Sequence, residues 1–342
     1  MLQSNYLSNK SSLMKIFYAI QATGNGHISR ASQLYPYLLK YGKVDFFLSG
    51  SNATLDMNFP VTYRSKGCSL YYSKCGGLDY WNITKNIWPK QIYNDANSLP
   101  LDKYDIIIND FDAITSLACK MQKVPSVQFG HQASFISQKT PRPIKKSIVG
   151  EMVLKHYASA PHNIGLHFEN YDSFIKPPII KDAIVAASPR DLEHITVYLP
   201  SFDKECIEKA FRKLKKIKFH WFLAGTAFKH TIDNITYYPV DQLHFNQSLI
   251  ECHGIITGGG FETPAEALFL GKKVLSIPIR NHYEQECNAA ALKKMGVPVI
   301  YKIDQNFDQI IMNWLNSNIM YPKIEANNLP ETLDYLFNNY AR

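Results

Sequence analysis

The sequence lacks the features that mark membrane-spanning, secreted and zinc-binding proteins. No apolar run approaches the ~18 residues that a membrane-spanning helix needs, and the polar opening MLQSNYLSNKSSLMK is unlike a secretory signal. The six cysteines include no CxxC pair, which argues against a zinc site or a disulfide framework and fits a reducing compartment. We therefore expect a cytoplasmic protein, either soluble or bound peripherally at the inner face of a membrane.

Charged residues are also few. They make up 19% of the 342 residues against 46% hydrophobic residues, a balance typical of a globular chain with room for two domains. Basic residues number 37 and acidic residues 29, and the formal charge of +8 favours anionic partners such as nucleotides or phospholipid, or else serves solubility. The basic residues are dispersed and no nucleic-acid-binding pattern appears, so we expect no nucleic-acid partner.

Short apolar runs alternate with helical periodicity along the first half. The run 15–21 leads through a glycine turn into a segment with helical spacing, in which Pro36 is expected to disturb the helix. Further strands are predicted at 43–50, 105–110 and 125–130, with a helix between the last two. Such alternation predicts a parallel sheet covered on both faces.

The alternation restarts after a proline-containing linker near residue 177. Strands are predicted at 195–200, 218–225, 234–240, 254–259 and 272–279, with helices between them and after them. The chain thus repeats one α/β architecture, which predicts two doubly wound halves facing a cleft. We expect an N-terminal domain over 14–178, a C-terminal domain over 179–318, and a final helix in 319–342 that packs back on the first half.

The segment GIITGGGFETPAEAL is the most informative part of the chain. Its strand ends in Gly258, Gly259 and Gly260, which allow close approach to the backbone, and a helix is predicted to start around Thr263. Unpaired amides and the positive end of the helix dipole suit a diphosphate. Two familiar phosphate motifs are absent: no GxxxxGK[ST] occurs, and GNGHIS has serine where GxGxxG needs its third glycine.

This region resembles the donor-binding half of the inverting, two-Rossmann (GT-B) nucleotide-sugar glycosyltransferases of family-1 type. Relatives of that kind include the UDP-glycosyltransferases and the N-acetylglucosaminyltransferase that forms lipid II. The resemblance implies that the glycine turn and helix bind the donor's diphosphate, that Glu266 binds ribose, and that an acidic and amide pair binds the sugar. One departure is Gly258, which stands where plant members carry a phosphate-binding histidine. The implied donor-binding residues are Gly258, Gly259, Gly260, Phe261, Glu262, Thr263, Glu266, Glu284, Gln285 and Asn288.

The resemblance extends to GNGHISR in the first half, where His27 takes the place of the family's acceptor-activating base. An imidazole titrates near neutral pH and suits that role. Asp110, at the end of a predicted strand, is the expected partner, with Asp112 as the alternative. Gly24, Gly26, Arg30 and His131 are candidates for contacts with acceptor or phosphate, although Arg30 could equally lie on a solvated helix face.

The expected activity is metal-independent transfer of a sugar from a nucleotide sugar, implied to be a UDP-sugar, to an acceptor hydroxyl. No cofactor is expected, because the nucleotide sugar is a co-substrate and no cluster has metal-ligand spacing. A glycan, lipid-linked or small-molecule acceptor fits this chemistry, including one in cell-envelope or surface glycolipid synthesis. A UDP-sugar 2-epimerase and a non-catalytic nucleotide-sugar-binding protein are the alternatives.

Two stretches of the first half point to the acceptor. The stretch 63–98 is rich in aromatic residues, and 137–160 carries several basic residues on a proline-broken and then helical segment. Aromatic rings can stack on sugars or enter a membrane interface, and lysines can face anionic lipid. Ordinary packing and a solvated cationic surface are the competing interpretations. The basic residues are Lys139, Arg142, Lys145, Lys146, Lys155 and His156.

Overall fold

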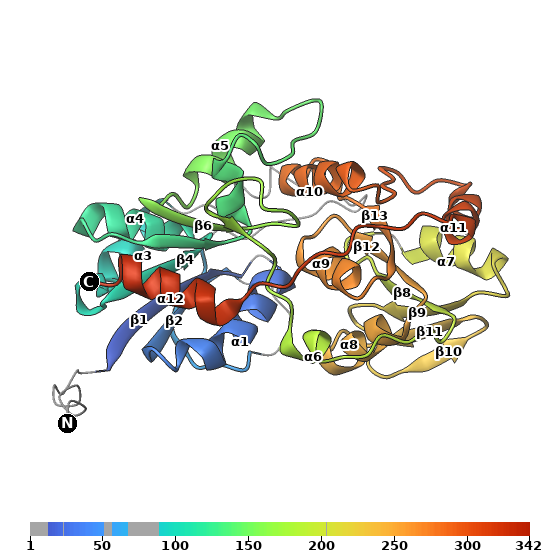
Figure 1. Ribbon diagram of the computed structural model, residues 1–342, viewed down its shortest axis with the longest axis horizontal. Helices are drawn as coiled ribbons and strands as arrows, with labels where there is room; N and C mark the ends of the chain where they lie inside the picture. The colour runs from blue at the N-terminus through green and yellow to red at the C-terminus, as the bar shows by residue number, and fades with distance from the viewer. Residues whose placement is uncertain (1–12, 23, 51–56, 68–88, 203) are drawn as a thin grey trace, which may run out of the picture.

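The computed structural model describes residues 13–22, 24–50, 57–67, 89–202 and 204–342 (Figure 1). Most of the aromatic stretch 63–98, including Tyr71, Tyr72, Tyr80, Trp81 and Trp88, lies outside these ranges.

The first half forms a parallel sheet in the order β3-β2-β1-β4-β5-β6-β7. In this order the chain winds outward in one direction from β1 and then in the other from β4, so the topological switch point lies between these two strands. The strands are β1 (Met14–Gln21), β2 (Gly42–Ser49), β3 (Val61–Ser65), β4 (Ile106–Asp110), β5 (Val127–Gly130), β6 (His162–Leu166) and β7 (Ile175–Lys176).

The second half repeats this plan in a sheet of order β10-β11-β9-β8-β12-β13, whose pairs are parallel except β10 with β11. Its switch point lies between β8 and β12. The strands are β8 (His194–Tyr198), β9 (Lys218–Phe222), β10 (His230–Ile232), β11 (Ile235–Tyr238), β12 (Gly254–Gly258) and β13 (Lys273–Ile277). Two doubly wound sheets are what the sequence predicts.

Helices cover both faces of each sheet, because side chains alternate across a strand and both sets are apolar. In β1, Ile16 and Tyr18 face the cluster that includes α1, while Phe17 faces the cluster of α3 and α4. The helices are α1 (Asn25–Leu38), α3 (Pro89–Ser98), α4 (Ala113–Gln122), α5 (Ile148–His156), α6 (Asp182–Val185), α7 (Lys204–Lys213), α8 (Gln242–Glu251), α9 (Glu262–Phe269), α10 (Tyr283–Lys294), α11 (Phe307–Asn316) and α12 (Leu329–Tyr340), with short 3-10 turns η1 (Leu101–Lys103) and η2 (Gln132–Ile136).

Two helices bear on local expectations from the sequence. The helix α1 continues through Pro36 to Leu38, because the proline lies in the last turn and removes only one late hydrogen bond. The helix α9 begins at Glu262, with Phe261 as its N-cap, one residue before the expected start around Thr263. Pro264 still costs nothing, because the third amide of a helix has no partner within the helix.

The last helix, α12, returns to the first half (Figure 1). Phe337 stacks on Tyr41 with ring centroids 4.2 Å apart, and the Tyr41 hydroxyl donates to Asp334 at 2.6 Å. The amide of Arg342 donates to the carbonyl of Asp105 at 2.8 Å. The chain therefore crosses from the first half to the second and back, which ties the two halves together.

Candidate functional site

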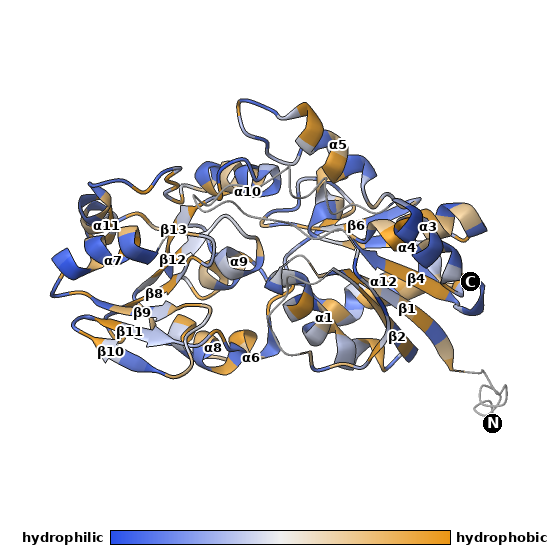
Figure 2. Cartoon of the chain, turned by 180° about the vertical axis from the view of Figure 1, so that it is seen from behind, coloured by the Kyte–Doolittle hydropathy of each residue, from blue (hydrophilic) through white to orange (hydrophobic). Residues whose placement is uncertain are grey.

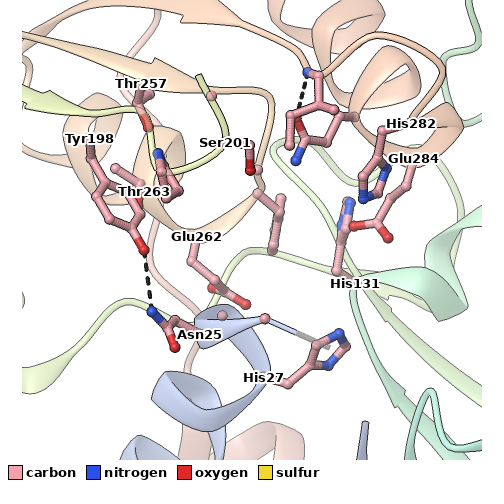
Figure 3. A pocket seen from close by; sticks show the side chains of 18 of the residues that line it. Asn25, His27, His131, Tyr198, Ser201, Thr257, Glu262, Thr263, His282 and Glu284 are labelled. Atoms are coloured by element: carbon pink, nitrogen blue, oxygen red, sulfur yellow. Dashed lines mark hydrogen bonds between the residues drawn. The ribbon is translucent and has the colours of Figure 1, made fainter. Parts of the chain in front are cut away.

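A cleft opens where the switch points of the two sheets face each other (Figure 3). Its volume is about 240 Å³, below the roughly 300–1,000 Å³ typical of ligand pockets. A contact between Arg30 and Glu262 joins its two walls. The first half contributes Gly24, Asn25, Gly26, His27, Arg30, His131 and Gln132; the second contributes Tyr198, Pro200, Ser201, Phe202, Thr257, Gly258, Gly260, Phe261, Glu262, Thr263, Ile279, His282, Glu284 and Gln285.

His27 lies in the first turn of α1, and Asp110 ends the neighbouring strand β4. The His27 Nδ1 lies 2.9 Å from Asp110 Oδ1. Asp112, the alternative partner, instead caps α4 by accepting from the Thr115 amide at 2.6 Å. The structure thus pairs His27 with Asp110, as the strand-end argument predicts.

Arg30 makes a two-pronged ion pair with the same carboxylate. Its Nη2 lies 2.7 Å from Asp110 Oδ1 and its Nε lies 3.0 Å from Oδ2. Burial alone would raise the pKa of Asp110, but Arg30 and His27 outweigh burial and lower it to about 2. Asp110 is therefore ionised at neutral pH. Arg30 itself is 4% exposed, so the solvated-face interpretation of Arg30 is wrong.

Gly130 is what allows this ion pair to form. A Cβ on Gly130 would lie 2.7 Å from Asp110 Oδ1. We expect Gly130→Ala to lower the free energy of unfolding by about 1–3 kcal/mol, as overpacking does, and to reduce turnover by displacing Asp110 from His27. Urea unfolding and an activity assay measure the two effects. Gly260→Ala is the stability control, because its Cβ would meet nothing within 4 Å; equal losses in both variants would contradict the explanation.

Gln132, which sequence reasoning missed, lies near the His27 nitrogen that does not contact Asp110. Burial alone would raise the pKa of Glu284, but nearby histidines and Gln132 lower it, so Glu284 is an ionised acceptor. The Gln132 amide nitrogen therefore points to Glu284 Oε2, at 3.1 Å, and it lies 3.4 Å from His27 Nε2. The His27 Nδ1 lies 2.9 Å from Asp110 Oδ1 and 3.0 Å from Arg30 Nη2. Because Asp110 is an ionised acceptor, we assign the tautomer in which Nδ1–H donates to Asp110 and Nε2 carries the lone pair, toward which the Gln132 amide points.

His131 and Asn288 connect the two halves, and His131 also lines the cleft. His131 Nε2 lies 2.7 Å from Asn288 Oδ1, and its ring stacks on Phe261 with centroids 3.9 Å apart. The Asn288 amide donates to the Gly259 carbonyl at 3.0 Å, and Asn288 is fully buried. These contacts fix the glycine turn relative to the first half.

The three glycines of the turn have different surroundings. A Cβ on Gly259 would lie 2.8 Å from Pro278 and 2.9 Å from Gln285, so close packing requires glycine there. The Gln285 side chain accepts from the amides of Gly259 at 3.2 Å and Ile279 at 2.9 Å, which holds the turn against α10. Gly260 faces open space and leaves its backbone accessible in the cleft.

Glu266 lies behind the cleft rather than in it. It is 2% exposed, and its carboxylate forms an ion pair with Lys181 at 2.8 Å. Lys181 is the N-cap residue of α6, and no pattern in the sequence predicts its pairing with a residue 85 positions away. Among the residues that line the cleft, Glu262 is the acidic side chain of α9.

Glu262 begins α9 and contacts Arg30 Nη1 across the cleft. Its side chain is 16% exposed. Burial raises the pKa of Glu262 to about 7: Arg30 lowers the pKa, but the carboxylates of Glu266 and Asp110 raise it together with burial. Within the described ranges, no group of three or more His, Cys, Asp or Glu could hold a metal ion. None of the helices placed by the structure is long and apolar enough to cross a bilayer.

Known proteins share this sequence pattern and this fold. An uncharacterized glycosyltransferase of Methanosarcina acetivorans is 23% identical over 328 residues, which cover 83% of this chain and 84% of that relative. The structure of Acinetobacter baumannii MurG matches with a TM-score of 0.57 at 13% identity, over 95% of this chain and 99% of that one. Arabidopsis thaliana UGT89C1 complexed with UDP matches with a TM-score of 0.57 at 10% identity, over 96% and 94%.

At these identities the structural matches show the fold, which is the GT-B arrangement of two Rossmann-like halves. The family is shown by the sequence: the model of glycosyl transferase family 1 matches residues 14–317, which include both halves of the cleft. The chain belongs to glycosyl transferase family 1 and is a glycosyltransferase.

Proposed function

We propose that this glycosyltransferase moves a sugar from a UDP-sugar to an acceptor hydroxyl by direct displacement at the cleft. One observation carries the proposal: the His27–Asp110 pair lies across a single cleft from the glycine turn and the N-terminus of α9. A base and an anion-binding helix end on opposite walls are the two groups that such a displacement needs.

The donor's diphosphate is proposed to bind at the turn 258–263. The first amides of α9 have no partner within the helix, and the helix dipole places partial positive charge at the same point. Arg30 adds a full positive charge from the opposite wall. UDP is proposed as the nucleotide because UGT89C1, which shares the fold, was solved with UDP.

The sugar is proposed to lie near Glu284 and Gln285, which line the cleft beside His27. Of the two, Glu284 has a carboxylate available for sugar hydroxyls, while the Gln285 carbonyl oxygen already accepts two backbone amides. A ribose contact by Glu266 would require its ion pair with Lys181 to rearrange, so this role stays a prediction.

The reaction forms one bond and breaks one. The acceptor oxygen attacks the anomeric carbon while its proton passes to His27 Nε2, and the bond from that carbon to the diphosphate breaks with inversion. Asp110 stabilises the imidazolium that forms. The departing diphosphate is stabilised by the amides of the turn, by α9 and by Arg30, and we propose that these groups suffice without a divalent ion.

The test is consumption of UDP-sugars with and without a panel of acceptors, in the presence of a chelator. Release of UDP that depends on an acceptor supports the proposal. Conversion of UDP-GlcNAc to an epimer without an acceptor would support the 2-epimerase instead, and binding without turnover would support a non-catalytic role. Loss of activity with the chelator, restored by a divalent ion, would overturn metal independence.

We further propose that α5 rests on an anionic lipid surface and brings the cleft to a membrane-borne acceptor. Ile148, Val149 and Met152 are 79%, 62% and 60% exposed on one face of this helix, and Val153 continues that face. Lys145 and Lys146 are exposed just before it. The opposite face is fixed to the second half, because the Tyr283 hydroxyl donates to Glu151 at 2.7 Å. In Figure 2, α5 protrudes at the edge of the molecule near α10.

Flotation with lipid vesicles tests this surface. We expect the protein to float with vesicles of phosphatidylcholine and phosphatidylglycerol and not with phosphatidylcholine alone. The double variant Ile148→Ser, Met152→Ser should reduce binding at least about tenfold, because each buried apolar side chain contributes about 1.5 kcal/mol or more. Leu243→Ser, at a residue that is 76% exposed on α8, is the matched control. Wild-type protein that stays unbound on anionic vesicles would refute the proposal.

A further inference from the structure

Glu262 occupies the position in which the proposed function places a diphosphate. Its side chain lies between the N-terminal turns of α9 and α1, and a Cβ on Gly26 would lie 3.3 Å from Glu262 Cγ. Figure 3 shows the Glu262 carboxylate within the cleft, on the side of Asn25 and His27. A carboxylate at this point interacts favourably with Arg30 and with the N-terminal end of α9, which are the groups that would attract a phosphate.

Glu262 lies among charged groups of both signs. From α1, Arg30 and His27 face it; from β4, Asp110; from β1, Tyr18; and from its own helix, Glu266. Arg30 donates to Asp110 through Nε and Nη2 but to Glu262 through Nη1 alone. Lys181 neutralises Glu266. The other ionisable groups that line the cleft are Glu284 in α10, His282 at its N-cap, His131 after β5 and Tyr198 at the end of β8.

We propose that Glu262 is a built-in competitor of the donor: it holds Arg30 and the end of α9 in the empty enzyme, and it takes up a proton from solvent when the diphosphate binds. The inference rests on the proposed function, since it requires a diphosphate at this turn. No covalent bond forms to Glu262. Once protonated, the side chain no longer repels the phosphates and can donate a hydrogen bond to a phosphate oxygen.

The raised pKa of Glu262, about 7, sets the direction of the pH effect. Above about pH 7 the empty enzyme holds an ionised Glu262, so donor binding must add a proton and should weaken about tenfold for each unit of pH. Well below pH 7 Glu262 is already protonated, and the affinity should become independent of pH. A nucleotide sugar is the suitable probe, because its diphosphate has no proton that titrates in this range.

The experiment is calorimetric titration with the tightest binder among UDP-glucose, UDP-galactose and UDP-GlcNAc. Binding is measured at about pH 6 and about pH 8, in two buffers of different ionisation enthalpy, to count the protons taken up. Wild-type protein should take up close to one proton at the higher pH. Glu262→Gln should take up none and should bind about tenfold more tightly than wild type at the higher pH.

Two further variants test which group takes up the proton when the donor binds. His27→Ala should keep the pH dependence, which shows that the imidazole is not its source. Asp308→Asn removes a first-turn carboxylate of α11 that pairs with Lys213, and it should behave as wild type.

An unchanged pH dependence in Glu262→Gln, or weaker binding at both pH values, would overturn the inference while leaving the proposed function intact. Binding of the donor to wild-type protein without proton uptake would also overturn the inference and leave the proposed function intact. This measurement does not depend on whether a variant folds. Failure of UDP and of every UDP-sugar to bind at either pH would overturn the proposed function itself.

Discussion

Replacing His27 with alanine is expected to lower kcat about 10²- to 10⁴-fold, the range that positioned general bases contribute. The geometry gives the reason: Asp110 accepts a hydrogen bond from Nδ1–H at 2.9 Å, and Nε2, in the tautomer assigned here, carries the lone pair in a side chain that lines the cleft. Without the imidazole, the acceptor hydroxyl must lose its proton to water. Steady-state kinetics with saturating donor and acceptor measure the loss.

The same variant should bind UDP nearly as well as wild type, because the diphosphate is proposed to contact α9 and Arg30 rather than the imidazole. His244→Ala, at a half-exposed histidine that pairs with Asp241 on α8, is the matched control and should retain full turnover. If His27→Ala and His244→Ala turn over at similar rates, His27 is not the base.

Replacing Asp110 with asparagine is expected to give the largest loss of stability, about 3–5 kcal/mol in the free energy of unfolding. Asparagine cannot accept both prongs of Arg30, which would then remain charged in a site where it is 4% exposed. Turnover should also fall, because the amide no longer stabilises a protonated His27. Urea unfolding at neutral pH measures the stability change.

The dependence on pH gives this prediction a second check. The pKa of Asp110 is lowered to about 2, so its ionised form stabilises the fold above its ordinary pKa of about 3.9 and that contribution disappears as the pH falls toward 2. The difference between wild type and Asp110→Asn should therefore narrow over that range. Asp308→Asn breaks a more exposed ion pair and should change stability little. A neutral-pH loss no larger than in this control would contradict the role of Asp110.

The sequence was a good guide wherever function depends on neighbouring strands. His27 follows one strand and Asp110 ends another, and adjacent parallel strands bring their carboxyl ends to one edge. This reasoning needs no knowledge of side-chain conformation. It also predicts that the glycine turn after β12 faces the same cleft, which the structure shows.

The sequence could not show how the buried polar residues are paired. Arg30 contacts a carboxylate 232 residues away, and Lys181 contacts one 85 residues away. Helical periodicity therefore does not predict that either side chain is buried. Gln132 was missed because a single glutamine in a sequence does not indicate a function. Its side chain matters because it contacts both His27 and Glu284. Likewise, nothing local distinguishes Asn288, which joins the two halves, from an asparagine that binds sugar.

A crystal structure of the protein with UDP bound would show directly whether the cleft is the donor site. We predict that the two phosphates lie against the backbone amides of residues 258–263, with Arg30 turned from Glu262 to a phosphate oxygen. UDP that binds elsewhere, or phosphates that leave the end of α9 vacant, would contradict the assignment of the cleft as the donor site.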